Sequence, residues 1–196
     1  MAKRKIKKQE EPIQFPDQYY VIAADLSLRC PGFCKILVTK TADGVDLSKA
    51  TTACVNNKQN QKSHGRLLDD IMKEFAFFCP TEHIPIYFVR EKAFNARASQ
   101  NEMGIYKVVG IMDWFLYRLS LDWSEIYPVT VKKCITGSGK ATKEEVAKAL
   151  DKWLPNMQYA TDDESDAAAV AISFLIQQGV LKVEEPDNDG CDKLPA

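Results

Sequence analysis

Apolar residues along this chain cluster in short runs and in stripes of helical spacing. Short apolar runs bounded by polar or turn-forming residues are typical of β-strands, and five of them cover residues 19–25, 33–39, 50–55, 84–89 and 125–129. Apolar positions that recur every three or four residues predict helices, and these cover residues 64–79, 99–119, 142–154 and 161–178. This order predicts an α/β domain that starts with an antiparallel hairpin and continues with alternating units, so that helices cover a mixed sheet.

Acidic residues stand at the ends of two predicted strands. The first apolar run ends on Asp25, and the run 84–89 is followed by Arg90 and Glu91. An aspartate in this place can simply cap the following turn. Acids at strand ends can also contribute to a metal site built from several rigid elements.

The start of the last predicted helix is strongly acidic. Between Thr161 and Leu175, four acids precede an Ala-rich apolar run that has no cationic side chain. Thr161 and Glu164 form a capping-box pattern, and acids in a first turn suit the positive end of the helix dipole. One interpretation is therefore an ordinary capped helix. The other is a site for a hard divalent cation, because Asp163 and Asp166 share one face and their repulsion would be relieved by such an ion.

The choice of metal ligands within this helix has competitors. Asp162 and Glu164 lie in the same turn, but we prefer Asp163 and Asp166 because Asp166 lies a turn deeper than capping requires. Two carboxylates do not hold two metals, so the acids at the strand ends are needed as well. Carboxylates from three rigid elements suit two-metal phosphodiester hydrolysis, in which two Mg²⁺ ions about 4 Å apart clamp the attacking and leaving oxygens.

A basic segment follows the last predicted strand. Residues 130–143 contain no acid and four lysines, which are Lys132, Lys133, Lys140 and Lys143. Thr136 to Lys140 resembles part of a phosphate-binding loop, but Cys134 stands where the first glycine of that pattern belongs. We therefore expect lysines that hold phosphates beside the acidic site rather than an ATP-binding loop.

The segment after Glu91 combines cations with one aromatic side chain. It contains Lys92, Phe94 and Arg97. Phe94 can anchor this loop to the core or can contact nucleic-acid bases. The next helix carries an apolar stripe from Ile105 to Leu119, which can cover either the sheet or a partner subunit.

Charge is balanced over the chain but not along it. With 26 Lys and Arg residues against 27 acids the net charge is −1, so the chain lacks the overall basic character of simple nucleic-acid binders. Residues 1–8 carry five cations, and residues 182–196 carry five acids and two lysines. We predict a basic N-terminal tail (1–18), one folded domain (19–180) and an acidic C-terminal tail (181–196), without a signal peptide or membrane span.

The cysteines and histidines exclude some kinds of site. The six cysteines form no C-x-x-C pair, and the only histidines are His64 and His83. We expect reduced thiols, no structural zinc site and no Cys-His catalytic pair.

Four motifs follow one another between residues 19 and 178. They are Asp25 after the first strand, the stretch 86–94 with Glu91 and Phe94, Val131-Lys132 with Thr136-Gly-x-Gly139-x-Ala141-x-Lys143, and Asp163-x-x-Asp166 opening an Ala-rich helix. In this order and spacing they resemble the RuvC family of Holliday-junction resolvases, which belongs to the RNase H-like superfamily.

The resemblance implies an RNase H-like fold with a central mixed five-stranded sheet flanked by helices. It also implies a homodimeric, Mg²⁺-dependent endonuclease, in the cytoplasm of a bacterial cell or phage-infected host, that nicks two strands of a four-way DNA junction symmetrically and leaves ligatable ends. Two Mg²⁺ ions per site, replaceable by Mn²⁺, would be held by Asp25, Glu91, Asp163 and Asp166. Asp25 would bridge both metals, Glu91 would hold one, and the pair on the helix would hold the other and orient the attacking water.

The resemblance also assigns residues that contact DNA. Lys132 and Lys143 map onto basic residues that contact or neutralise the scissile phosphate, and Phe94 maps onto an aromatic side chain that stacks on bases near the crossover. Nearby cations are expected to bind the nucleic acid too, namely Lys92, Arg97, Lys133 and Lys140.

One departure from the family pattern, and several alternative functions, remain open. The family usually places a Gly-containing turn after its first aspartate, whereas residues 26–29 read Leu-Ser-Leu-Arg here, so the cleavage-sequence preference is undetermined. Another RNase H-like nuclease, acting on RNA/DNA hybrids or branched DNA, is the nearest alternative. A non-catalytic nucleic-acid-binding module is a further one, although four carboxylates buried together without metal would be costly. An actin-like ATPase would need a second domain and phosphate loops.

Overall fold

The central strand of the sheet, β1 (Gln18–Asp25), is buried on both faces. The computed structural model describes residues 13–57, 62–93 and 102–183. The other strands are β2 (Gly32–Thr41), β3 (Gly44–Cys54), β4 (Ile86–Glu91) and β5 (Trp123–Ile126), and the sheet order is β3-β2-β1-β4-β5. β1, β2 and β3 pair antiparallel, whereas β4 and β5 extend the sheet parallel to β1. The predicted mixed five-stranded sheet is therefore confirmed.

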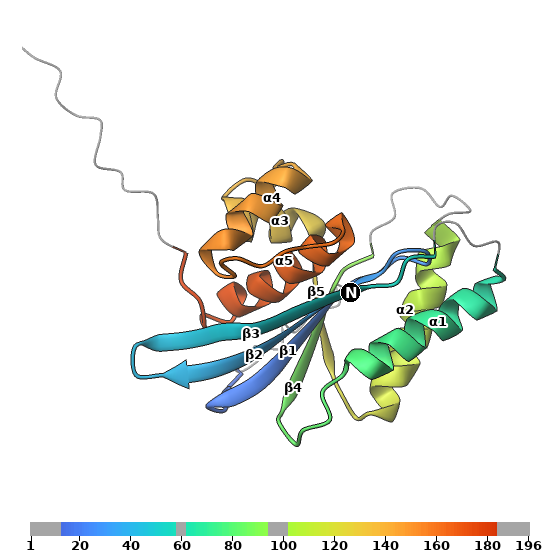
Figure 1. Ribbon diagram of the computed structural model, residues 1–196, viewed down its shortest axis with the longest axis horizontal. Coiled ribbons are helices and arrows are strands. Elements are labelled where there is room, and N and C mark those ends of the chain that lie inside the picture. Colours follow the sequence, from blue (N-terminus) through green and yellow to red (C-terminus); the bar gives the residue numbers. More distant parts are fainter. Residues whose placement is uncertain (1–12, 58–61, 94–101, 184–196) are drawn as a thin grey trace, which may run out of the picture.

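Helices cover both faces of this sheet (Figure 1). α1 (His64–Phe78) and α2 (Glu102–Arg118) lie on one face; α3 (Pro128–Thr136), α4 (Lys143–Ala149) and α5 (Asp162–Gln177) lie on the other, with a 3-10 turn η1 (Leu150–Lys152) after α4. Side chains of a strand alternate between the two faces. In β1, Val21 and Ala23 face α5, whereas Ile22 and Ala24 face α1 and α2. Odd-numbered positions at the end of β1 thus point toward α5.

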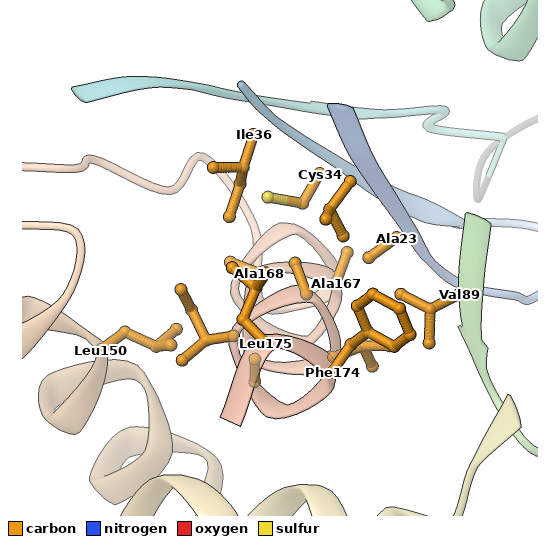
Figure 2. Packing of buried hydrophobic residues seen from close by; sticks show 14 of the residues in the cluster. Ala23, Cys34, Ile36, Val89, Leu150, Ala167, Ala168, Phe174 and Leu175 are labelled. Carbon is orange, nitrogen blue, oxygen red and sulfur yellow. The ribbon is translucent and has the colours of Figure 1, made fainter. Parts of the chain in front are cut away.

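Helix α5 packs closely on the sheet because its buried face is made of small side chains. Ala167 and Ala168 lie next to Ala23 and Cys34 of the central strands, as Figure 2 shows. Phe174, two turns later, fills the wider space near Val89 of β4. This packing holds the first turn of α5 near the ends of β1 and β2.

The segment after β5 was predicted incorrectly. Residues 125–129 were expected to be a strand followed by a basic loop, but β5 ends at Ile126 and α3 begins at Pro128. Proline is favoured in the first helical turn, and Gly137 ends the helix in the left-handed conformation (φ 78°). Val131 and Ile135, four residues apart, anchor α3 in the core, so Lys132 and Lys133 project from a helix rather than from a loop.

Residues on both sides of the predicted domain 19–180 also pack against the folded core. Phe15, which was assigned to the basic tail, stacks on Tyr19 with ring centroids 4.7 Å apart and contacts Tyr87. Leu181 also packs against the core. β3 is longer than the predicted strand 50–55. Among the described residues, no helix is long and apolar enough to cross a membrane.

Candidate active site

The ends of β1 and β4 lie side by side at one edge of the sheet. The two strands run parallel with Ala24 paired to Arg90, so Asp25 and Glu91 are the next residues of each strand. Both continue the positions that face α5, because side chains alternate along a strand. The start of α5, with Asp163 in its first turn and Asp166 in the next, lies against the same edge.

The carboxylates from these three elements influence one another. Burial, followed by the negative charges of Asp166 and Asp163, raises the pKa of Asp25 to about 7. Burial, followed by the charges of Asp25 and Asp166, also raises the pKa of Glu91 to about 7. Shifts of this kind arise when like charges share a partly desolvated site. The structure therefore places the four carboxylates that the sequence analysis selected near enough for their charges to act on Asp25 and Glu91.

Lys143, at the start of α4, places a cation among these carboxylates. Its ammonium group forms an ion pair with Asp166. Partial burial alone would lower the pKa of Lys143, but the hydrogen bond with Asp166 and the charges of Asp25 and Asp163 raise it above its usual value. The ammonium group thus compensates part of the negative charge of the site.

The residues present fit a hard divalent cation. As they stand, no three His, Cys, Asp or Glu side chains in the described part of the chain are gathered closely enough to hold a metal ion. However, the donor set consists of carboxylate oxygens, which are the ligands that Mg²⁺ and Mn²⁺ prefer. The position beside Asp166 favours positive charge, because the ammonium of Lys143 pairs with Asp166 there and the charges of Asp25 and Asp163 also raise the pKa of Lys143.

Lys132 lies near the site but is held by the backbone. Its Nζ donates a hydrogen bond to the carbonyl oxygen of Ala141 at 2.7 Å, which connects α3 to the segment before α4. Its charge also lowers the pKa of Glu91, although less than Lys143 does. Lys132 therefore stabilises the loop that leads into α4 and Lys143, in addition to any contact with substrate.

The other predicted DNA-binding residues are spread more widely. Lys133 and Lys140 are exposed. The ammonium group of Lys92 lies 4.9 Å from the ring centroid of Tyr127 and 3.7 Å from a carboxylate oxygen of Glu125. Phe94 and Arg97 lie outside the described residues. Exposed Tyr127, which the sequence analysis did not select, lies immediately before α3 on the site's edge of the sheet.

A buried arginine supports the end of β4 from the opposite face. The side chain of Arg90 is 4% exposed and pairs with Asp113 of α2 and with Glu125 of β5, 2.9 Å away. Its guanidinium also lies 5.4 Å from the ring centroid of Trp123. Sequence reasoning gave Arg90 no role, because its partners lie 23 and 35 residues away in the chain.

Removing the ammonium of Lys143 is expected to change metal binding and catalysis in opposite directions. In Lys143→Met the internal cation no longer competes for the carboxylates, so the affinity for Mn²⁺ should rise several-fold. DNA cleavage should fall by about 10- to 100-fold if this cation stabilises the phosphate in the transition state. Calorimetric titration with Mn²⁺ and single-turnover cleavage measure the two effects. Lys148→Met, an exposed lysine of the same helix, is the control, and weaker Mn²⁺ binding by Lys143→Met would contradict the competition.

Comparison with protein families gives a match over most of the chain. The family model described as Crossover junction endodeoxyribonuclease RuvC matches residues 21–174. The protein of that name from Prochlorococcus marinus is 34% identical over 93 residues, which are 47% of this chain and 58% of that protein. The one from Zymomonas mobilis is 31% identical over 91 residues, 46% of this chain and 54% of that protein. The chain thus spans little more than half the length of these curated relatives.

Solved structures share the fold. Thermus thermophilus RuvC, in complex with Holliday junction substrate, aligns with a TM-score of 0.59 and 20% identity over 83% of this chain and 97% of that chain. The yeast mitochondrial Holliday junction resolvase Ydc2 aligns with a TM-score of 0.53 and 13% identity over 85% of this chain and 81% of that chain. At such identities the likeness shows the architecture, which is the RNase H-like sheet and helix arrangement predicted above.

Proposed function

Because the chain belongs to the RuvC family of crossover junction endodeoxyribonucleases, we propose that it is an endonuclease that resolves four-way DNA junctions by paired, symmetric nicks. The observation that carries this proposal is the convergence of carboxylates from β1, β4 and α5 beside the ammonium of Lys143. The T. thermophilus relative solved with a Holliday junction supports the class of substrate.

Divalent cations, Mg²⁺ with Mn²⁺ as a substitute, would be held by the four carboxylates of Asp25, Glu91, Asp163 and Asp166. When bound, they supply positive charge at the phosphodiester and make the attacking water more acidic. The chain itself contributes the rigid placement of these ligands, because each comes from the end of a strand or the first two turns of a helix. Burial and the neighbouring negative charges raise the pKa of Asp25 and of Glu91 to about 7, and Asp166 pairs with Lys143.

The two lysines near the carboxylates have different tasks in this proposal. The ammonium of Lys143 pairs with Asp166 in the metal-free chain, and with cations held by the carboxylates it would be available to neutralise the scissile phosphate. Lys132 keeps its hydrogen bond to the carbonyl of Ala141, so its charge stays at a fixed position. Positioned cations of this kind stabilise negative charge that develops during phosphoryl transfer.

Paired nicks require two active sites, and we propose that a second copy of the chain supplies the other. The apolar stripe of α2 does not provide this contact, because Val108, Met112 and Leu116 are buried against the chain's own sheet. The opposite side of α2 carries exposed aromatic residues instead, with Trp114 60% and Tyr117 76% exposed. Neighbouring exposed aromatic side chains of this kind can mark a protein interface.

The same surface extends over the neighbouring helix. A hollow of about 380 Å³ lies between the two helices, lined by residues that include Met72, Ala76, Ile111 and Trp114. A β-carbon at Gly110 would meet nothing within 4 Å, so this part of α2 offers room for another helix to approach.

Changing this surface is expected to separate the subunits. The double variant Trp114→Glu/Tyr117→Ser should sediment as a monomer at micromolar concentrations, because it puts charge and polarity at the centre of the apolar patch. Its nicks on a junction should lose their pairing. Ile13→Ser, at another exposed apolar residue, is the control. A wild-type protein that sediments as a monomer under the same conditions would exclude the proposed dimer.

Cleavage of labelled DNA tests the proposed activity directly. The protein is incubated with a synthetic four-way junction, a linear duplex of the same sequence and an RNA/DNA hybrid, each with Mg²⁺, with Mn²⁺ and with EDTA. We expect symmetric nicks confined to the junction and dependent on the divalent cation. Cleavage of the hybrid alone would overturn junction resolution in favour of another RNase H-like nuclease. Binding of the junction without cleavage in either cation would indicate a non-catalytic module.

A further inference from the structure

Glu164 is a buried acid within the acidic first turn of α5, and it points toward β3. The residue is 7% exposed. Its Oε2 accepts a hydrogen bond from Thr52 Oγ1 at 2.9 Å and another from the backbone N–H of Ala160 at 3.0 Å. The predicted capping box is thus only half present. Thr161 Oγ1 accepts the bond from Glu164 N, but the Glu164 carboxylate binds Ala160 and β3 rather than the N–H of Thr161.

Gly32, at the start of β2, lies directly beneath the same turn. It is the antiparallel partner of Asp25 on one side and of Cys54 on the other. A β-carbon at Gly32 would lie 1.9 Å from the carbonyl oxygen of Asp163 and 2.3 Å from its carbonyl carbon. Only glycine leaves room for this approach, so the backbone of Asp163 is fixed one strand away from Asp25.

Cys54, at the end of β3, completes the contact. Its side chain hydrogen-bonds to that of Thr161, the N-cap of α5. Thr52 and Cys54 are two residues apart on one strand, so both project from the same face. Gly32, Thr52 and Cys54 therefore form a cradle, the β2–β3 cradle, that contacts α5 at three successive places.

From these contacts we propose that Glu164 is a positioning residue, not a metal ligand, and that its bond to Thr52 in the β2–β3 cradle fixes the rotation of α5 that turns Asp163 and Asp166 toward Asp25. The residue lies between the two ligands in the sequence, so its anchor sets the orientation of both. The inference rests on the proposed function in one respect, since it takes Asp163 and Asp166 to be ligands.

The physical effect acts through geometry. At the start of α5 the buried side chains are small, namely Ala167 and Ala168, and small side chains interlock only weakly with the sheet, so they leave the rotation of this part of the helix loosely fixed. A hydrogen bond from a buried carboxylate to a neighbouring strand opposes such motion, since breaking it leaves polar atoms unpaired away from water. Groups that orient metal ligands in this way commonly change affinity or activity by about 10- to 100-fold when they are removed.

Two substitutions remove the bond from either side. Thr52→Val keeps the shape and removes the donor, and Glu164→Ala removes the acceptor. Both are expected to lower the affinity for Mn²⁺, titrated calorimetrically without DNA, by about 10-fold or more, and to lower kcat for junction cleavage with little change in KM. Glu164→Gln still accepts both hydrogen bonds, so it should restore Mn²⁺ affinity to near that of the wild type.

Matched controls come from the neighbouring positions. Thr51→Val is made on the same strand at an exposed residue, and Asp162→Ala removes an exposed acid from the same helical turn; both should bind Mn²⁺ as the wild type does. Circular dichroism checks that each variant is folded, and if Glu164→Ala does not fold, Thr52→Val decides alone.

Each outcome separates the inference from the proposed function. Wild-type Mn²⁺ affinity in Thr52→Val would overturn the positioning role, and a Glu164→Gln variant as weak as Glu164→Ala would make Glu164 a ligand instead. A wild-type protein that binds Mn²⁺ but does not cut junctions would contradict the proposed function alone, because the affinity comparison needs no substrate.

Discussion

Asp25→Asn is expected to lower the rate of junction cleavage by about 10³-fold or more while leaving the chain folded. Asp25 lies at the end of the central strand, where burial and the negative charges of Asp166 and Asp163 raise its pKa. An amide cannot replace a carboxylate in holding a divalent cation. Gel-based single-turnover assays measure the rate, and junction binding by the variant shows that the DNA surface is intact. Asp43→Asn, in an exposed turn, should cleave at the wild-type rate.

The same substitution is expected to stabilise the metal-free protein at alkaline pH. The pKa of Asp25 is raised to about 7 in the folded chain, against about 4 in the unfolded chain. Between these values the folded state keeps a proton that the unfolded state has lost, so the free energy of unfolding falls as the pH rises and the full penalty is present above pH 7. Asp25→Asn removes this penalty, so it should raise the free energy of unfolding at pH 8 by about 2–4 kcal/mol. At pH 4 we expect no gain.

Denaturant unfolding in EDTA at the two pH values measures this effect. A variant that is less stable than the wild type at pH 8 would show that the ionised carboxylate is favourably paired, for instance with Lys143, rather than in repulsion with its neighbours.

Divalent-cation binding is expected to weaken steeply between pH 8 and pH 6. Asp25 and Glu91 both have a pKa of about 7 without metal, so below that pH a cation must displace a proton from each. With about a tenfold loss for each group, the affinity for Mn²⁺ should fall roughly 10- to 100-fold over this range. Cleavage at a limiting concentration of cation should fall in parallel.

Titration in buffers with different heats of ionisation counts the protons released. The wild type should release between one and two protons on binding at pH 6, and Asp25→Asn should release fewer. An affinity independent of pH would mean that these two carboxylates do not take part in binding the cation.

Part of the candidate site could be predicted from local patterns. A continuous apolar run that ends on an acid predicts a buried strand with a carboxylate at its end, and this holds for β1 with Asp25. The first turn of α5 could also be predicted, because a Thr N-cap and a run of acids favour the start of a helix. These signals lie within a few residues, so the sequence alone carries them.

Other parts depended on contacts between distant segments. α3 was not predicted, because its sequence is short and basic and runs into a glycine-containing segment; the local signals for this helix are Pro128 in its first turn and the spacing of Val131 and Ile135. The partners of Arg90 come from α2 and β5. Glu164 looked like a helix cap or a ligand, and only its bond to Thr52, 112 residues away in the chain, distinguishes a positioning role.

The sequence by itself determined the order of strands and helices, the acidic residues at their ends and the family to which they point. These follow from hydrophobic periodicity and from capping, which act between near neighbours. Only the tertiary structure decided which carboxylates meet, which cation lies among them, and which acid faces β3 instead. The reason is that the pKa values of Asp25 and Glu91 and the orientation of α5 arise from burial and from charges on other elements, and distances between elements are set by packing rather than by sequence spacing.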